Sequence, residues 1–118
     1  MKNKRIWLSS PHMGSNEIEY VKRVFESNWI APVGPEIISF EEKVSEFLDD
    51  RHVAALSSGT SAIHLALILL GVELGDDVIC SSFTFTASAN PILYQHASPI
   101  FIDSEIETWN MCPNYLEK

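Results

Sequence analysis

The most constraining feature of this sequence is the stretch 52–67, in which two apolar runs flank a turn of small residues. Residues 53–57 have the composition of a short strand, and residues 60–70 that of a buried helix ended by Gly71. A strand that leads through a tight turn into a helix is the repeating unit of α/β proteins. We therefore expect an α/β fold.

The same alternation continues along the chain. Strands are predicted at 78–82 and 98–103, and 84–94 is predicted to be a helix that Pro91 bends or interrupts. Strands that alternate with helices at this spacing indicate βαβαβ units and a parallel sheet. Residues 107–118 are predicted to form a turn and the start of another element, so we expect the sequence to be part of a larger, incomplete fold.

Two amphipathic helices are predicted ahead of the sheet, after an irregular arm. Asn16 and Glu19 have the spacing of a capping box for the first helix, and Pro35 begins the second. The predicted division of the chain is an arm with two helices, 1–50, and the first part of an α/β domain, 51–118.

Charge and composition exclude several classes of partner. The formal net charge is −8, from 8 Lys and Arg against 16 Asp and Glu, and no basic stripe is present, so we expect no nucleic-acid or membrane partner. The longest apolar run, 62–72, is far shorter than the roughly 20 residues that span a bilayer. Cys80 and Cys112 show neither metal-site nor disulfide spacing, which is typical of a cytoplasmic protein. No metal ligand is predicted.

The turn at Gly59 is the strongest candidate site. A helix that begins there points the N–H groups of Thr60, Ser61 and Ala62, with two hydroxyls, at the space above the strand end. The helix dipole adds partial positive charge, which favours a phosphate. An ordinary helix capped by Ser or Thr would have the same sequence, and this alternative stays open. The absence of a Gly-x-Gly-x-x-Gly or Gly-Lys-Ser/Thr motif argues against a dinucleotide-binding module or a P-loop.

Other candidate residues carry weaker signals. A hydroxyl-rich segment follows the second predicted strand, where ligands of α/β sheets bind, and Phe83 or Phe85 could lie flat on a planar ligand. Both rings could instead be core residues. Asp103 is expected to cap a turn, and His64 to be a hydrogen-bonded core histidine. Trp29 could hold its loop together or line a binding site.

Taken together, these segments resemble the N-terminal third of the DegT/DnrJ/StrS family of sugar aminotransferases. The resemblance extends from about Ile6 to the last residue and depends on four motifs in the same order: Gly34-Pro35 with Phe40-Glu41, Ser58-Gly59-Thr60-Ser61-Ala62 with His64-Leu65-Ala66-Leu67, Ser82-Phe83-Thr84-Phe85-Thr86-Ala87 with Asn90, and Pro99-Ile100-Phe101-Ile102-Asp103. Family members are fold-type I enzymes that depend on pyridoxal 5′-phosphate. The resemblance implies that the chain is the start of their three-layer large domain, preceded by two helices.

The resemblance also implies roles for individual residues. Gly59, Thr60 and Ser61 match the positions that hold the cofactor phosphate, and Phe85 matches the aromatic residue that stacks on the pyridine ring. Phe83 would then be a core residue. In the family, the lysine that binds the cofactor covalently and the acidic residue that pairs with the ring nitrogen lie further downstream. None of the five lysines here matches that motif, so no catalytic residue is predicted, and the chain alone is expected to be inactive or at best a weak cofactor binder.

For the parent protein, the family implies transfer of an amino group, usually from glutamate, to a keto group of a nucleotide-linked sugar. The product would serve amino-sugar or surface-polysaccharide biosynthesis. Family members act as homodimers with active sites at the interface, so the loop 28–34 is a candidate interface element. The alternative is a truncated, non-enzymatic binding or regulatory member of the same family.

Overall fold

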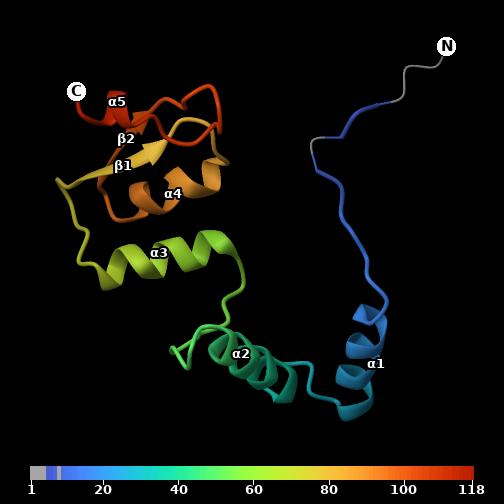
Figure 1. Cartoon of the computed structure of the whole chain (residues 1–118). Coiled ribbons are helices and arrows are strands. Elements are labelled where there is room, and N and C mark those ends of the chain that lie inside the picture. Colours follow the sequence, from blue (N-terminus) through green and yellow to red (C-terminus); the bar gives the residue numbers. More distant parts are fainter. Residues whose placement is uncertain (1–4, 8) are drawn as a thin grey trace. The chain divides into compact units, whose positions relative to one another are not determined.

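The chain divides into two units, Met1–Ala55 and Leu56–Lys118, in a computed structural model that describes residues 5–7 and 9–118. The first unit contains α1, Glu17–Ser27, and α2, Pro35–Phe47 (Figure 1). Part of the predicted irregular arm, residues 1–4 and 8, lies outside the described residues, and the part described before α1 forms neither helix nor strand. The domain boundary predicted after residue 50 stays a prediction.

The helices α1 and α2 begin and end close to the predicted positions. Asn28 closes α1 in the left-handed conformation, with φ of 59°, and Pro35 opens α2. The predicted capping box is wrong, because Asn16 makes no side-chain cap. The Glu19 carboxylate instead accepts a hydrogen bond from Lys22 Nζ at 2.9 Å.

Residues 53–57 do not form a strand, so this prediction is wrong. A strand needs a neighbour for its backbone hydrogen bonds, and apolar composition alone cannot supply one. The N–H of Ala55 donates instead to the Glu41 carboxylate at 2.8 Å. Within the described residues the sheet has two strands, and each is the other's partner.

The second unit contains the predicted parallel sheet in reduced form. β1, Asp77–Ser81, pairs in parallel with β2, Ser98–Ile102, and the register runs from Asp77↔Ser98 to Ser81↔Ile102. Three helices accompany the sheet (Figure 1): α3, Gly59–Leu69, before β1; α4, Thr86–Tyr94, between the strands; and the short α5, Pro113–Leu116. The predicted strand–helix–strand unit is therefore confirmed, with a parallel pair.

The residues predicted to end helices behave differently from one another. Gly71 follows α3 with φ of 76°, a left-handed conformation that costs glycine little, as predicted. Pro91 lies inside α4 and does not interrupt it. Its side chain is less than 2% exposed, so packing compensates for the hydrogen bond that its missing N–H cannot make.

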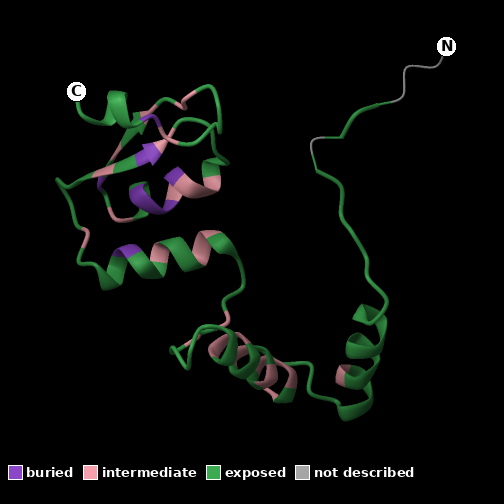
Figure 2. Ribbon diagram, viewed as in Figure 1, coloured by how far each residue is buried: buried purple, intermediate pink, exposed green. Residues whose placement is uncertain are grey.

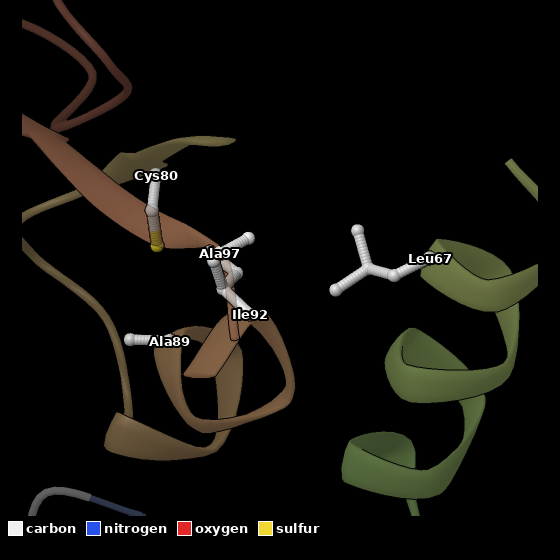
Figure 3. Packing of buried hydrophobic residues seen from close by; sticks show 5 residues of the cluster. All are labelled: Leu67, Cys80, Ala89, Ile92 and Ala97. Carbon is white, nitrogen blue, oxygen red and sulfur yellow. The ribbon is translucent and has the colours of Figure 1, made fainter. Parts of the chain in front are cut away.

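The core of the second unit lies between the sheet and α4, as the purple segments of Figure 2 indicate. Ile92 is its most buried member, at 2% exposed, and the cluster in Figure 3 comprises Leu67, Cys80, Ala89, Ile92 and Ala97. Side chains alternate along a strand, so Ile79 and its partner Ile100 lie on the other face of the sheet, at 51% and 41% exposed. On the face that carries Cys80, the paired residue Phe101 is still 54% exposed, so the sheet is packed on part of one face only.

A tight turn after β2 is closed by one carboxylate. Ser104 and Met111 form an isolated antiparallel bridge around it. The Glu105 carboxylate accepts hydrogen bonds from the N–H of Glu107 at 2.6 Å, from the N–H of Thr108 at 2.7 Å and from the Thr108 hydroxyl. The Thr108 hydroxyl, more than the backbone N–H groups, lowers the pKa of Glu105 below its ordinary value of 4.5.

We expect this turn to open in acid. Because folding lowers the pKa of Glu105, its carboxylate stabilises the turn fully above pH 4.5, and this stabilisation is lost as the pH falls below 4.5. The readout is the fluorescence of Trp109, whose ring centroid lies 5.3 Å from that of Phe83, in protein with Trp7 and Trp29 replaced by phenylalanine. The control, Glu105→Gln, should lose the acid transition. A transition with its midpoint above pH 4.5 would contradict the assignment.

Candidate functional site

The first turn of α3 contains the residues predicted to hold a phosphate. Ser58 is the N-cap, in an extended conformation with φ of −163° and ψ of 161°, and its hydroxyl accepts the N–H of Ser61 at 3.1 Å. The carbonyl of Ser58 accepts the N–H of Ala62, also at 3.1 Å, as the first hydrogen bond of the helix. Two of the N–H groups predicted to be free are therefore engaged. Those of Gly59 and Thr60 have no acceptor among the described residues.

Ser58 is the residue of this turn to which the sequence analysis gave no role of its own. The signal was present, because serine directly before a helix is a preferred cap. The structure also shows that the two interpretations of the turn are compatible. The cap takes one N–H group, of Ser61, and leaves two for a ligand.

The turn that carries the N–H groups of Gly59 and Thr60 is also rich in hydroxyl groups. The Ser61 hydroxyl lies 3.2 Å from that of Ser57 and 3.0 Å from that of Ser58, whereas the Thr60 hydroxyl has no partner among the described residues. A Cβ added at Gly59 would meet no atom within 4 Å, so the space beside this residue is open. The first turn of α3 contains no acidic residue. Free N–H groups, hydroxyls and the positive end of a helix dipole together suit a phosphate dianion.

The aromatic residue predicted to stack on a ligand lies at the start of α4. Phe85 is the N-cap residue, with φ of −64° and ψ of 145°, and it is 80% exposed. The hydroxyls of Thr84 and Ser88 lie 2.7 Å apart, and the N–H of Ser88 donates to the carbonyl of Phe85 at 2.9 Å. An exposed ring on a hydrogen-bonded turn can stack on a planar ligand. The stacking role of Phe85 stays a prediction.

Of the two residues considered after β1 and β2, Asp103 has its predicted role and Phe83 does not. Phe83 is not a core residue, so that prediction is wrong: it is 64% exposed, and its ring centroid lies 5.3 Å from that of Trp109. It lies two residues after Ser81, the last paired residue of β1. Asp103 has the structural role predicted for it, because its carboxylate accepts the Ser82 hydroxyl at 3.1 Å and the N–H of Ser104 at 2.8 Å.

In the first unit, Trp29 has both features considered for it. Its ring lies 3.5 Å from the place of a Cβ at Gly34, whose φ is 152°, so the loop folds back on the ring. The residue is 52% exposed and lines a hollow of about 360 Å³. Arg23 and Glu36 also line this hollow, and their 3.3 Å ion pair joins α1 to α2. Trp29 therefore both packs its own loop and forms part of a concave surface.

Residues 5–7 and 9–118 contain neither a metal-binding cluster nor a membrane-spanning helix. No three His, Cys, Asp or Glu side chains in this part of the chain lie close enough together to hold a metal ion. No helix among the same residues is long and apolar enough to cross a membrane. Cys80 and Cys112 are both buried free thiols.

Comparison with known sequences finds aminotransferases that match nearly the whole chain. The sequence profile of the DegT/DnrJ/EryC1/StrS aminotransferase family matches residues 11–118. EpsN of Bacillus subtilis (strain 168), whose name describes a pyridoxal phosphate-dependent aminotransferase, is 57% identical over 116 residues, which are 98% of this chain and 30% of EpsN. The GDP-perosamine synthase of Escherichia coli O157:H7 is 41% identical over 115 residues, which are 98% of this chain and 32% of the synthase.

Among solved structures, a sugar aminotransferase matches the fold of this chain. The PLP-form of Spr1654 from Streptococcus pneumoniae, described as a sugar aminotransferase, matches with a TM-score of 0.82 and 32% identity. The match covers 97% of this chain and 29% of that one. The chain thus spans about 30% of the length of the relatives that it matches.

Proposed function

Because this chain belongs to the DegT/DnrJ/EryC1/StrS aminotransferase family, we propose that its second unit contributes the phosphate-binding part of a pyridoxal 5′-phosphate site in a sugar aminotransferase. The observation that carries the proposal is the first turn of α3. There the N–H groups of Gly59 and Thr60 have no acceptor among the described residues, and a Cβ added at Gly59 would meet no atom within 4 Å.

The residues present fit a cofactor phosphate. The N–H groups of Gly59 and Thr60 and the hydroxyls of Thr60 and Ser61 would donate to its oxygens, and the dipole of α3 would stabilise its charge. Phe85 is 80% exposed, so its ring is accessible and would lie against the pyridine ring. Burial of one ring face by an aromatic side chain would also exclude water from that face.

At such a site the cofactor supplies the chemistry, and the protein binds and orients the cofactor. When bound, pyridoxal phosphate supplies an electron sink that stabilises negative charge developing on the substrate carbon during amino transfer. The residues of this chain bind its phosphate and orient its ring, and we assign them no proton transfer. None of the five lysines is proposed as the residue that binds the cofactor covalently.

The reaction proposed for the whole protein is transfer of an amino group, from glutamate, to a keto group of a nucleotide-linked sugar. The similarity of this chain to a GDP-perosamine synthase supports a sugar nucleotide as the substrate. The product would enter polysaccharide biosynthesis in the cytoplasm, a location with which two free thiols are compatible. We further propose a homodimer in which the loop 28–34 lies at the interface, since Trp29 presents an exposed ring there.

The test compares three small molecules on the same protein. Pyridoxal phosphate should bind at least about tenfold more tightly than pyridoxal, because the phosphate gains charge-assisted hydrogen bonds, and inorganic phosphate should compete with it. Equilibrium dialysis measures the three affinities. Equal affinity for pyridoxal and its phosphate would refute the site. Amino transfer from glutamate to a nucleotide-linked keto sugar, assayed with the whole protein, then tests the reaction, and sedimentation velocity tests the dimer.

A further inference from the structure

One polar contact joins the two helices that carry the halves of the proposed site. The side-chain Nε2 atoms of His64, on α3, and of Gln95, directly after α4, lie 2.6 Å apart. The side-chain amide of Gln95 and the imidazole of His64 therefore share one hydrogen bond, in which the donor and acceptor roles depend on the tautomer of the ring. The ring of His64 also meets that of Tyr94 edge-on, with centroids 5.3 Å apart. His64 is hydrogen-bonded as predicted, but the prediction that it is a core residue is wrong, because it is half-buried and lies outside the buried cluster.

The packing of α3 against α4 also includes a buried apolar contact. Among the described elements, α4 is the one against which α3 packs extensively. Leu67 is the only buried residue of α3, and Figure 3 shows its side chain directed toward Ile92 and Ala97. A contact between apolar side chains has little directional preference, so it leaves α3 more freedom to tilt or rotate than a directional contact would. A hydrogen bond has a direction and removes that freedom.

Small movements of α3 matter because both halves of the site lie at helix starts. Gly59 lies eight residues before Leu67, which is about 12 Å along a helix, so a tilt of about 5° about Leu67 would move Gly59 by about 1 Å. Phe85 at the start of α4 would not follow this movement. A displacement on the order of 1 Å is enough to weaken a ligand that must meet both residues at once.

We propose that His64 and Gln95 are a positioning pair, which sets the phosphate-binding turn of α3 at the right distance from the aromatic ring at the start of α4. This inference rests on the proposed function, because it assumes one ligand that contacts Gly59 and Phe85 together. Neither His64 nor Gln95 touches that ligand. They act on it only through the relative placement of α3 and α4.

The test uses variants that remove the hydrogen bond and keep the bulk. His64→Phe keeps a ring beside Tyr94 but has no ring nitrogen, and Gln95→Leu has no amide. Each is expected to lower the affinity for pyridoxal phosphate about fivefold to tenfold, and the double variant no further, since both break the same bond. His64→Gln restores a hydrogen-bonding group and should bind within about twofold of the parent protein. The control Tyr94→Phe keeps the ring and should bind normally.

A second probe separates positioning from simple destabilisation. Inorganic phosphate needs only the turn of α3, so its affinity should stay unchanged in His64→Phe and Gln95→Leu, measured well below the melting temperature. Loss of phosphate and pyridoxal phosphate affinity by equal factors, or unchanged pyridoxal phosphate affinity in both single variants, would overturn the pair. Failure of the parent protein to prefer pyridoxal phosphate to pyridoxal would instead refute the proposed function, and the pair with it.

Discussion

Replacement of Gly59 by aspartate is expected to weaken pyridoxal phosphate binding severely while leaving α3 at least as stable as before. The position is the first residue of the helix, where a carboxylate interacts favourably with the helix dipole, by about 0.3–1 kcal/mol. The added side chain would enter open space. The same carboxylate would lie beside the bound phosphate, and repulsion on the order of 2 kcal/mol corresponds to a loss of about 30-fold.

The matched control for this variant is Gly59→Asn, which has nearly the same size and shape without the charge. Asparagine should weaken binding only by the bulk that it adds, so the difference between the two variants isolates the electrostatic effect. Equilibrium dialysis gives the affinities, and thermal unfolding shows whether α3 remains folded. Equal affinities for the two variants would mean that no phosphate approaches this turn.

Replacement of Ile92 by alanine is expected to cause the largest loss of stability of any single truncation in the second unit. Ile92 is 2% exposed and is the most buried member of a cluster of five buried residues. Truncation of a buried isoleucine costs about 2–5 kcal/mol, which is a large share of the 5–15 kcal/mol that typically stabilises a domain. Urea unfolding followed by circular dichroism measures the change.

The neighbouring residue supplies the control for this experiment. Leu93 lies on the same helix and is 54% exposed, so Leu93→Ala removes similar apolar bulk from a position in contact with solvent. Its cost should stay near 0.5 kcal/mol. Comparable losses in the two variants would show that α4 does not pack in the way described here.

The elements that the sequence analysis placed well are those whose cause is local. Pro35 begins α2 and Gly71 follows α3, because their backbones favour those conformations wherever they occur. The parallel pairing of β1 with β2 was also predictable, since the helix between them is a short crossover. The apolar runs and the breaker residues were sufficient for these assignments.

The candidate site was located only in part. The turn at Gly59 was identified from its small residues, and the structure confirms that a helix begins there. The N–H groups of Ser61 and Ala62 were wrongly predicted to be free, because the hydroxyl and the carbonyl of Ser58 accept them. Phe83 was expected in the core, yet burial depends on which segments cover a ring rather than on its own composition.

By itself, the sequence determined where helices start and stop, that the two strands are parallel, and that a turn rich in small residues opens α3. Only the tertiary structure decided that residues 53–57 are unpaired, that Ser58 leaves two N–H groups free, and that His64 meets Gln95. The physical reason is the distance along the chain over which each kind of interaction acts. Backbone preferences act within a few residues, whereas pairing and burial, like the contact between His64 and Gln95, depend on segments that are brought together only when the chain folds.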